Sequence, residues 1–366
     1  MQWRMWPALV LLVLLCQGAG TASAHVDYVT DDGNSAVPVG EFLGTALGEP
    51  LSLVLLGAGG FGAVAVAGGY LRYATRLTDV QVGIRTLRSY RPYLGWMLRL
   101  AIGLPLVGAG FSGYYFSPSV PAEARLLQVI LGFALLFGLA TRLVAAVGLV
   151  AYVAGLVVNF PELLLASEFI GGFLGVLVVG PGQPSADMLL RRLVVTDGTL
   201  LSRFRGVPTP ATLLNRAGLT RELGPVLIRV GLGLNFMYLG VTQKWLQPAD
   251  GLAVVERYGL ESVVPVSPEL WVFGAGLVEL GIGVLFLTGC FTRGAAVAGF
   301  VVLTMTLFGL ADDPVLAHIT LFGLTSALMV TGSGRYSLDE TLVPWLHRRL
   351  AADSDPADSP APSAGD

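Results

Sequence analysis

The sequence predicts an all-α membrane protein with about nine transmembrane helices, arranged as two parallel four-helix bundle repeats plus one extra N-terminal span. Three observations predict this fold class. The 366-residue chain is 54% apolar and only 13% charged, which is typical of membrane proteins. Its apolar runs approach the ~20 residues needed to cross a bilayer core. Its motifs also recur in the same order in two parts of the chain.

The repeat is visible in matched segments. Residues 97–118 (MLRLAIGLPLVGAGFSGYYFSP) match 227–248 (LIRVGLGLNFMYLGVTQKWLQP), which pairs Arg99 with Arg229. Residues 138–150 (GLATRLVAAVGLV) match 289–301 (GCFTRGAAVAGFV), and each part closes with a Gly-x-Gly turn followed by Ser and Asp. The same elements in the same order indicate one folding unit used twice. Comparison of the two copies therefore shows which polar residues both have kept and which only one has kept.

The predicted spans are 51–71, 95–116, 123–140, 142–160, 162–180, 223–244, 269–289, 292–311 and 314–331. The loops on one side of these spans hold most of the arginines, whereas the other side holds only Arg125, Lys244 and Arg257. The positive-inside rule then places the mature N-terminus outside and the C-terminus in the cytoplasm of a multi-pass plasma-membrane protein. Four spans per copy give both copies the same orientation, unlike the inverted repeats of many transporters.

The remaining segments follow from this topology. Residues 1–24 have the charge, apolar run and Ala-x-Ala end of a signal peptide, with an uncleaved anchor helix as the alternative. An outer segment (25–50) precedes the extra span and its basic inner loop (51–92). Copy 1 (93–190) and copy 2 (223–341) are joined by a basic inner linker (191–222). An inner helix and a disordered, Asp- and Pro-rich tail complete the chain (342–366).

The extra span contains GAGGFG (57–62), which fits the dinucleotide pattern Gly-x-Gly-x-x-Gly. We reject that interpretation because the pattern lies inside an apolar helix rather than after a strand of a βαβ unit. Small residues in a membrane helix instead favour close helix packing.

Polar residues kept by both copies are interpreted as structural. Thr141-Arg142 and Thr292-Arg293 open a span at the inner surface, where Thr suits the helix N-cap. We expect each Arg to reach a lipid headgroup or the Asp of the closing turn, which is Asp187 or Asp339. Ser337 with Glu340 forms a capping box.

Polar residues kept by one copy are the functional candidates. Glu279 lies within a span where copy 1 has Gln128, and an acid in a membrane is a functional candidate by default. Lys244, the only lysine, and His318 also lack matches. We expect these three to converge on one outward-opening pocket as catalytic groups, with Asn235 and Gln243 as binding residues. The alternative is a structural Lys244–Glu279 pair in which Lys244 merely extends to the membrane surface.

Two further features set the copies apart. Segment 249–268 is an insertion in the outer loop of copy 2, and its spaced apolar residues predict a lid over the pocket. Glu168 is a membrane acid found only in copy 1, and the sequence assigns it no partner. The three histidines are too scattered for a zinc or haem site, so we expect no metal, and no nucleic-acid-binding surface is visible.

Copy 2 resembles the DoxX family of small four-helix membrane proteins. The resemblance rests on Lys244 and Pro248, on Glu279, on Thr292-Arg293, and on GSGRYSLD (332–339), which holds Gly334, Arg335, Ser337 and Asp339. Copy 1 resembles the family more weakly because it lacks the Lys, the inserted loop and the Glu. The family is similar to DoxD, the membrane subunit of thiosulfate:quinone oxidoreductase. The resemblance implies a quinone-linked redox role with a partner subunit that handles sulfur or thiol substrates.

Two hypotheses of different classes follow. In the first, the chain is the quinone-interacting subunit of a redox complex, and Glu279 and Lys244 bind or protonate a quinone carbonyl. In the second, it is a non-catalytic scaffold, a maturation factor or a small-molecule permease. The sequence leaves the substrate, the electron donor and homo-oligomerisation open.

Overall fold

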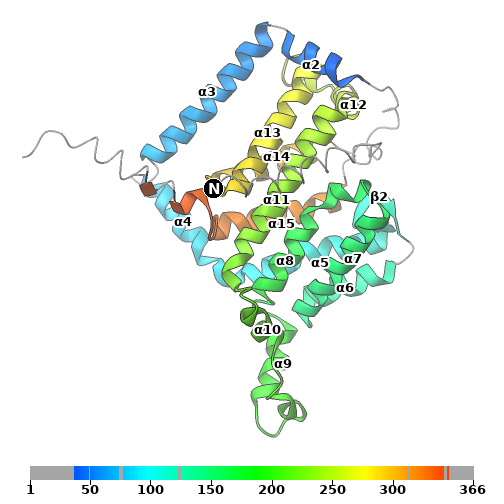
Figure 1. Cartoon of the computed structure of the whole chain (residues 1–366), viewed down its shortest axis with the longest axis vertical. Helices are drawn as coiled ribbons and strands as arrows, with labels where there is room; N and C mark the ends of the chain where they lie inside the picture. The colour runs from blue at the N-terminus through cyan, green and yellow to red at the C-terminus, as the bar shows by residue number, and fades with distance from the viewer. Residues whose placement is uncertain are drawn as a thin grey trace, which may run out of the picture.

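The computed structural model describes residues 37–48, 50–73, 77–122, 125–310, 314–341 and 344–345. These residues form an all-helical protein with one small β-ribbon (Figure 1). The predicted signal peptide and the predicted disordered tail lie outside the described residues. Together, the apolar helices make the chain a multi-pass membrane protein.

Each predicted span coincides with an apolar helix. These helices are α3 (Pro50–Tyr73), α5 (Leu94–Ser112), α6 (Arg125–Phe137), α7 (Thr141–Val158), α8 (Glu168–Val179), α11 (Gly224–Tyr238), α13 (Pro268–Thr288), α14 (Thr292–Gly309) and α15 (Val315–Thr331). Six helical stretches are long and apolar enough to cross a membrane, whereas α6, α8 and α15 are shorter. At ~1.5 Å per residue, these three cover less than the ~30 Å bilayer core. The count of nine spans therefore stays a prediction.

Irregular segments shorten some of these helices. α5 ends at Gly113, whose φ of +88° suits glycine, and a ribbon of β1 (Tyr114–Tyr115) and β2 (Ser117–Pro121) follows. A 3₁₀ turn, η2 (Glu162–Ala166), precedes α8. In the second half, α11 continues instead into η5 (Leu239–Leu246), a π-helix. The two predicted copies thus differ most at this end of the bundle.

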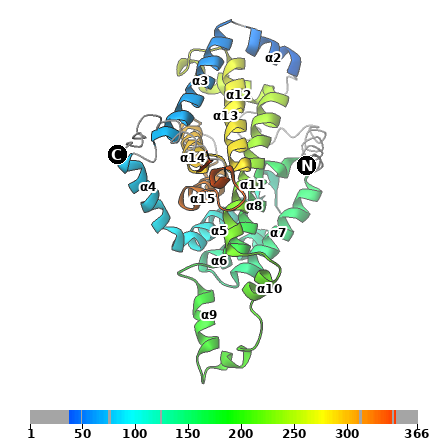
Figure 2. The ribbon, with the colours of Figure 1, turned by 60° about the vertical axis from the view of Figure 1, so that its left-hand side comes forward.

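Shorter helices connect and cover the spans. They are α2 (Val39–Gly48), α4 (Thr78–Ser89), η1 (Arg91–Tyr93), α9 (Ala186–Val195), η3 (Leu200–Phe204), α10 (Pro210–Arg216), η4 (Arg221–Leu223), α12 (Pro248–Tyr258) and η6 (Leu260–Ser262). The predicted lid segment contains α12, which packs with α2 against α13 around Phe42, Val255 and Val272. α9 and α10 extend away from the bundle at its other end (Figures 1 and 2).

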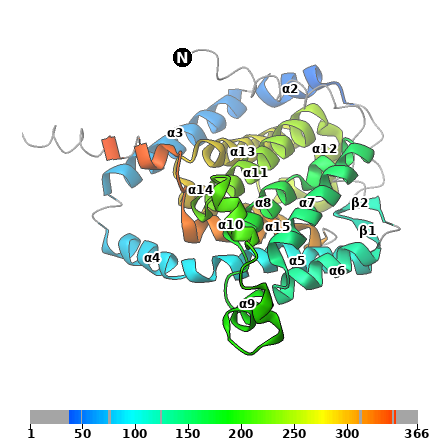
Figure 3. The same ribbon diagram turned by 60° about the horizontal axis from the view of Figure 1, so that its bottom comes forward.

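The two halves pack reciprocally. The last helix of each half, α8 or α15, lies against the first helix of the other, α11 or α5 (Figure 3). One continuous apolar core therefore includes Ile102 and Phe173 of the first half and Ile228 and Leu324 of the second. This arrangement brings residues from both halves to the centre of the molecule.

Glycines permit this close packing. A methyl group at Gly231 of α11 would lie 2.6 Å from the Cα of Gly171 in α8, and one at Gly323 of α15 would lie 2.2 Å from the Cβ of Ala101 in α5. We expect Gly231→Ala to cost about 1–3 kcal/mol of stability, because two backbones must separate. Thermal unfolding in detergent, followed by circular dichroism, measures this cost. Gly57→Ala on α3 is the matched control.

The extra span α3 behaves differently from the others. It is a continuous helix, as expected for an apolar GAGGFG segment. A methyl group added at any of its four glycines would nevertheless meet no neighbouring atom within 4 Å; these are Gly57, Gly59, Gly60 and Gly62. The prediction that these glycines pack closely against another helix is therefore wrong for the part of the chain that the structure describes. α3 instead meets the rest of the chain near its ends, through α2 and through an edge-to-face contact of Tyr70 with Phe291. Gly57→Ala should accordingly leave stability unchanged, and an equal loss in both variants would contradict the packing argument.

Candidate functional site

The end of the bundle that carries the Thr-Arg pairs, here called the arginine end, is closed by two carboxylates. Asp187 accepts backbone N–H bonds from Ala140 (2.6 Å) and Thr141 (2.9 Å). In the second half, Asp339 accepts them from Phe291 (2.6 Å) and Thr292 (3.0 Å). Each carboxylate therefore satisfies N–H groups at the start of the helix after the tight turn.

This geometry corrects the predicted roles of the threonines. Thr141 and Thr292 are the first residues of α7 and α14, and the N-cap residues are Ala140 and Phe291. Both threonine hydroxyls are buried and have no hydrogen-bond partner among the described residues. The prediction of threonine N-caps is wrong, because an Asp from a distant turn accepts the hydrogen bonds of the N–H groups at the start of each helix.

The arginines do not contact these carboxylates. Arg142 donates from Nε to Leu177 O (2.8 Å) and from Nη2 to Val178 O (3.1 Å). Arg293 donates equivalently to Met329 O (3.0 Å) and Val330 O (3.3 Å). A cation at the end of α8 or α15 satisfies carbonyls that lack a helical partner. The expected Arg–Asp contact is therefore replaced by two Arg–carbonyl contacts.

A second, buried arginine in each half completes the arginine end. Arg229 donates to the carbonyls of Phe286, Leu287, Arg335 and Tyr336, whereas Arg99 donates to those of Leu136 and Pro184. Ser337 accepts from Glu340 N at 3.3 Å, so the Ser337 side of the predicted capping box is confirmed. These contacts explain the polar residues of the arginine end as structural ones.

Cys290, in the turn between α13 and α14, is the free thiol among the described residues. Its pKa is raised above the ordinary value, mainly by burial and further by the charge of Asp339. The thiolate is the reactive form of cysteine, so this environment disfavours a redox-active thiol here.

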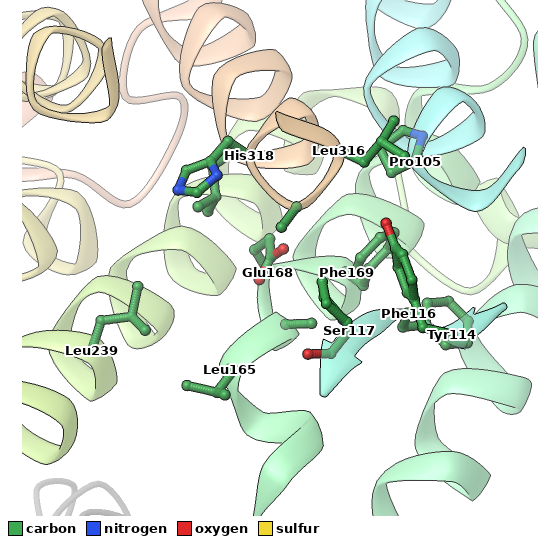
Figure 4. A pocket seen from close by; sticks show the side chains of 14 residues that line it. Pro105, Tyr114, Phe116, Ser117, Leu165, Glu168, Phe169, Leu239, Leu316 and His318 are labelled. Atoms are coloured by element: carbon green, nitrogen blue, oxygen red, sulfur yellow. The ribbon is translucent and has the colours of Figure 1, made fainter. Parts of the chain in front are cut away.

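A pocket lies between the two halves, at the end of the bundle opposite the arginine end. Its lining comes from α5, the β-ribbon, η2, α8, η5 and α15 (Figure 4). Apolar and aromatic residues dominate the lining, together with a few polar ones: Pro105, Tyr114, Phe116, Ser117, Pro118, Leu165, Ala166, Glu168, Phe169, Leu239, Leu316, Ala317, His318 and Leu321. The free volume of this pocket is about 20 Å³, enough for about one water molecule, so a larger ligand enters only when the lining side chains move. An apolar pocket with a few convergent polar groups is the usual form of a small-molecule site.

Glu168 is the acid of this pocket, and the structure supplies the partner that the sequence did not. Its side chain is 2% exposed, and Asn235 Nδ2 lies 3.1 Å from its Oε2. The same amide nitrogen contacts Leu165 O (3.0 Å) and Ser167 Oγ (3.1 Å). Asn235, predicted to bind substrate beside Glu279, therefore faces the acid of the first half. The sequence could have indicated both residues as site candidates, because each is a single polar residue in an apolar helix.

His318 lies in the same pocket. It is 3% exposed, and its Nδ1 is 3.2 Å from Pro314 O, which orients the ring. Glu168 and His318 lie on the same side of the pocket, and Phe116 and Tyr114 lie across from them (Figure 4). An acid, a histidine and aromatic walls are therefore contributed by both halves of the chain.

The other predicted catalytic residues lie elsewhere. Glu279, Lys244 and Gln243 do not line this pocket, and neither does any residue of α12. Gln243 donates from Nε2 to Gln247 Oε1 at 3.2 Å. Glu279 packs against Gly240, where a built methyl would be 3.2 Å from its Cβ. The residues predicted for one pocket are therefore divided: Asn235 and His318 lie with Glu168, whereas Gln243, Lys244 and Glu279 do not line that pocket.

No group of three or more His, Cys, Asp or Glu side chains that could hold a metal ion occurs among the described residues. The polar groups of the pocket suit a hydrogen-bonding organic ligand, since an acid accepts bonds and a histidine donates or accepts them.

The fold and these sites define a multi-pass, all-helical integral membrane protein. Residues 224–312 match the model of the DoxX family, so the second half carries a DoxX domain. The matched residues include Asn235, Lys244 and Glu279 but exclude Glu168 and His318. No curated protein and no solved structure matches the chain.

Proposed function

We propose that this DoxX-like membrane protein binds a quinone in the pocket between its halves and acts as the quinone-binding subunit of a redox complex. The observation that carries the proposal is the placement of Glu168 and His318 in one largely apolar pocket. Aromatic walls suit a flat ring, and an acid with a histidine suits its carbonyl oxygens. The DoxX domain supports the redox assignment through the resemblance described above.

The chemistry divides between this chain and a partner. Reduction of a quinone to a quinol takes two electrons and two protons. His318 and Glu168 would deliver protons to the ring oxygens, since both side chains change protonation state. A partner subunit would supply the electrons. In this proposal the protein lies in the plasma membrane with the pocket toward the outer leaflet, as the arginine distribution predicts.

Binding of a short-tailed quinone to the purified, detergent-solubilised protein tests this function. We expect His318→Ala to weaken binding about tenfold, because loss of one hydrogen bond to the ligand costs about 1.4 kcal/mol. Thr325→Ala is the matched control: Thr325 lies on the same helix, is fully buried and does not line the pocket. Equal affinity in both variants, or no binding to the unaltered protein, would overturn the assignment.

One observation favours the second function, a scaffold. Residues 186–216, which include α9 and α10, extend from the arginine end, and none of them is buried (Figure 2). Such an exposed basic segment suits partner docking. A protein that binds no quinone but retains a partner through this segment would support the scaffold function.

A further inference from the structure

Glu279 occupies a second polar region, within the second half alone. It lies midway along α13 and faces Gly240 in η5, the π-helix that continues α11. Lys244 follows Gly240 by four residues in the same π-helix, which packs on α13. π-Helical turns recur at functional sites because they widen a helix locally.

The carboxyl group of Glu279 is not satisfied by the protein. Its Oε2 is buried and has no hydrogen-bond partner among the described residues. Among the described residues, no hydrogen bond or ion pair within 4.0 Å joins Glu279 and Lys244. An unpaired carboxyl oxygen inside a membrane costs several kcal/mol, so a donor from another molecule is expected there.

The first half provides the internal comparison. Gln128 holds the position that matches Glu279, and its amide is satisfied at both ends. Its Oε1 accepts from Phe116 N at 3.1 Å, and its Nε2 donates to Tyr114 O at 2.9 Å. Tyr114 is the sequence match of Lys244. The amide of Gln128 thus hydrogen-bonds to the backbone of its own half, whereas the carboxyl group of Glu279 is left without a protein donor.

We propose that Glu279 and Lys244 hold one hydroxyl group of a membrane-soluble quinol, at a site separate from the pocket of Glu168 and His318. A hydroxyl donates its proton to Glu279 and accepts a bond from Lys244, so it bridges two side chains that do not touch. With Glu279 ionised, a quinone carbonyl offers it no hydrogen-bond donor and leaves the carboxylate unsatisfied. The site therefore selects quinol over quinone. The ligand class rests on the proposed function, but the residues do not.

Binding stoichiometry under reducing conditions tests this second site. The probe is a short-tailed benzoquinol, with its dimethyl ether as the control ligand. We expect two equivalents of quinol on the unaltered protein and one on Glu279→Leu or Lys244→Met. Trp245, next to Lys244 and stacked on Phe273, gives a local readout, since quinol should quench its fluorescence in the unaltered protein but not in Glu279→Leu or Lys244→Met. Glu269→Leu, in the first turn of the same helix, should still bind two equivalents.

The outcomes separate the two proposals. One equivalent of quinol, lost in Glu168→Leu and kept in Glu279→Leu, would overturn the second site and leave the pocket in place. One equivalent lost only in Glu279→Leu would overturn the pocket and support the second site. Binding of the dimethyl ether as tightly as the quinol would overturn hydroxyl recognition. Absence of Trp245 quenching at saturating quinol would mean that water alone bridges Glu279 and Lys244, which also overturns the proposal.

Discussion

Arg229→Leu is expected to destabilise the protein by about 3–5 kcal/mol, more than any other single change at the arginine end. Arg229 is 2% exposed and donates to four backbone carbonyls, with distances of 2.5–3.4 Å. Two belong to the end of α13 and two to the closing turn. A leucine leaves all four acceptors without this donor, and a hydrogen bond to a charged group is worth about 1.5–3 kcal/mol. Thermal unfolding in detergent, followed by circular dichroism, measures the loss.

Arg99→Leu is the matched variant of the first half. Arg99 is equally buried, but it donates to two carbonyls, and its Nε and Nη1 have no partner among the described residues. We therefore expect a loss of about 1–3 kcal/mol, clearly smaller than for Arg229→Leu. Equal losses would show that burial of the side chain, and not the number of carbonyl bonds, decides the stability of the arginine end.

The helices themselves were predictable from the sequence. Apolar runs mark them because a membrane span must satisfy its own backbone and present apolar side chains to lipid. α13 and α14 accordingly begin and end within one or two residues of the predicted spans 269–289 and 292–311. The short α8 was less predictable, because an apolar run does not distinguish a 3₁₀ turn such as η2 from the α-helix that follows it.

The roles of the polar residues were less predictable, because they depend on contacts between distant segments. Thr141 fits a local capping rule, yet Asp187 reaches the same N–H groups through the fold. Likewise, Asn235 and Glu168 are far apart in sequence and meet only because α8 packs on α11. Comparison of the copies identified Glu279 as different from Gln128, but it could not show that Asn235 faces the other half. Pattern comparison thus finds unusual residues, whereas packing decides which of them share a site.

Glu168→Leu is expected to weaken quinone binding about 10- to 100-fold, the largest functional effect of any pocket residue. A buried carboxyl group that hydrogen-bonds a ring oxygen contributes about 1.5–3 kcal/mol, and every 1.4 kcal/mol changes affinity tenfold. The fold should survive, because Asn235 keeps Leu165 O and Ser167 Oγ as acceptors after the change. Thr320→Val, at the sequence match of Glu168 in the second half, is the control, since Thr320 is buried outside the pocket. A double-mutant cycle with His318→Ala decides between direct and indirect effects: two groups that contact one ligand should show a coupling of about 1 kcal/mol or more, whereas additive losses would mean that Glu168 acts only through the packing of the two halves.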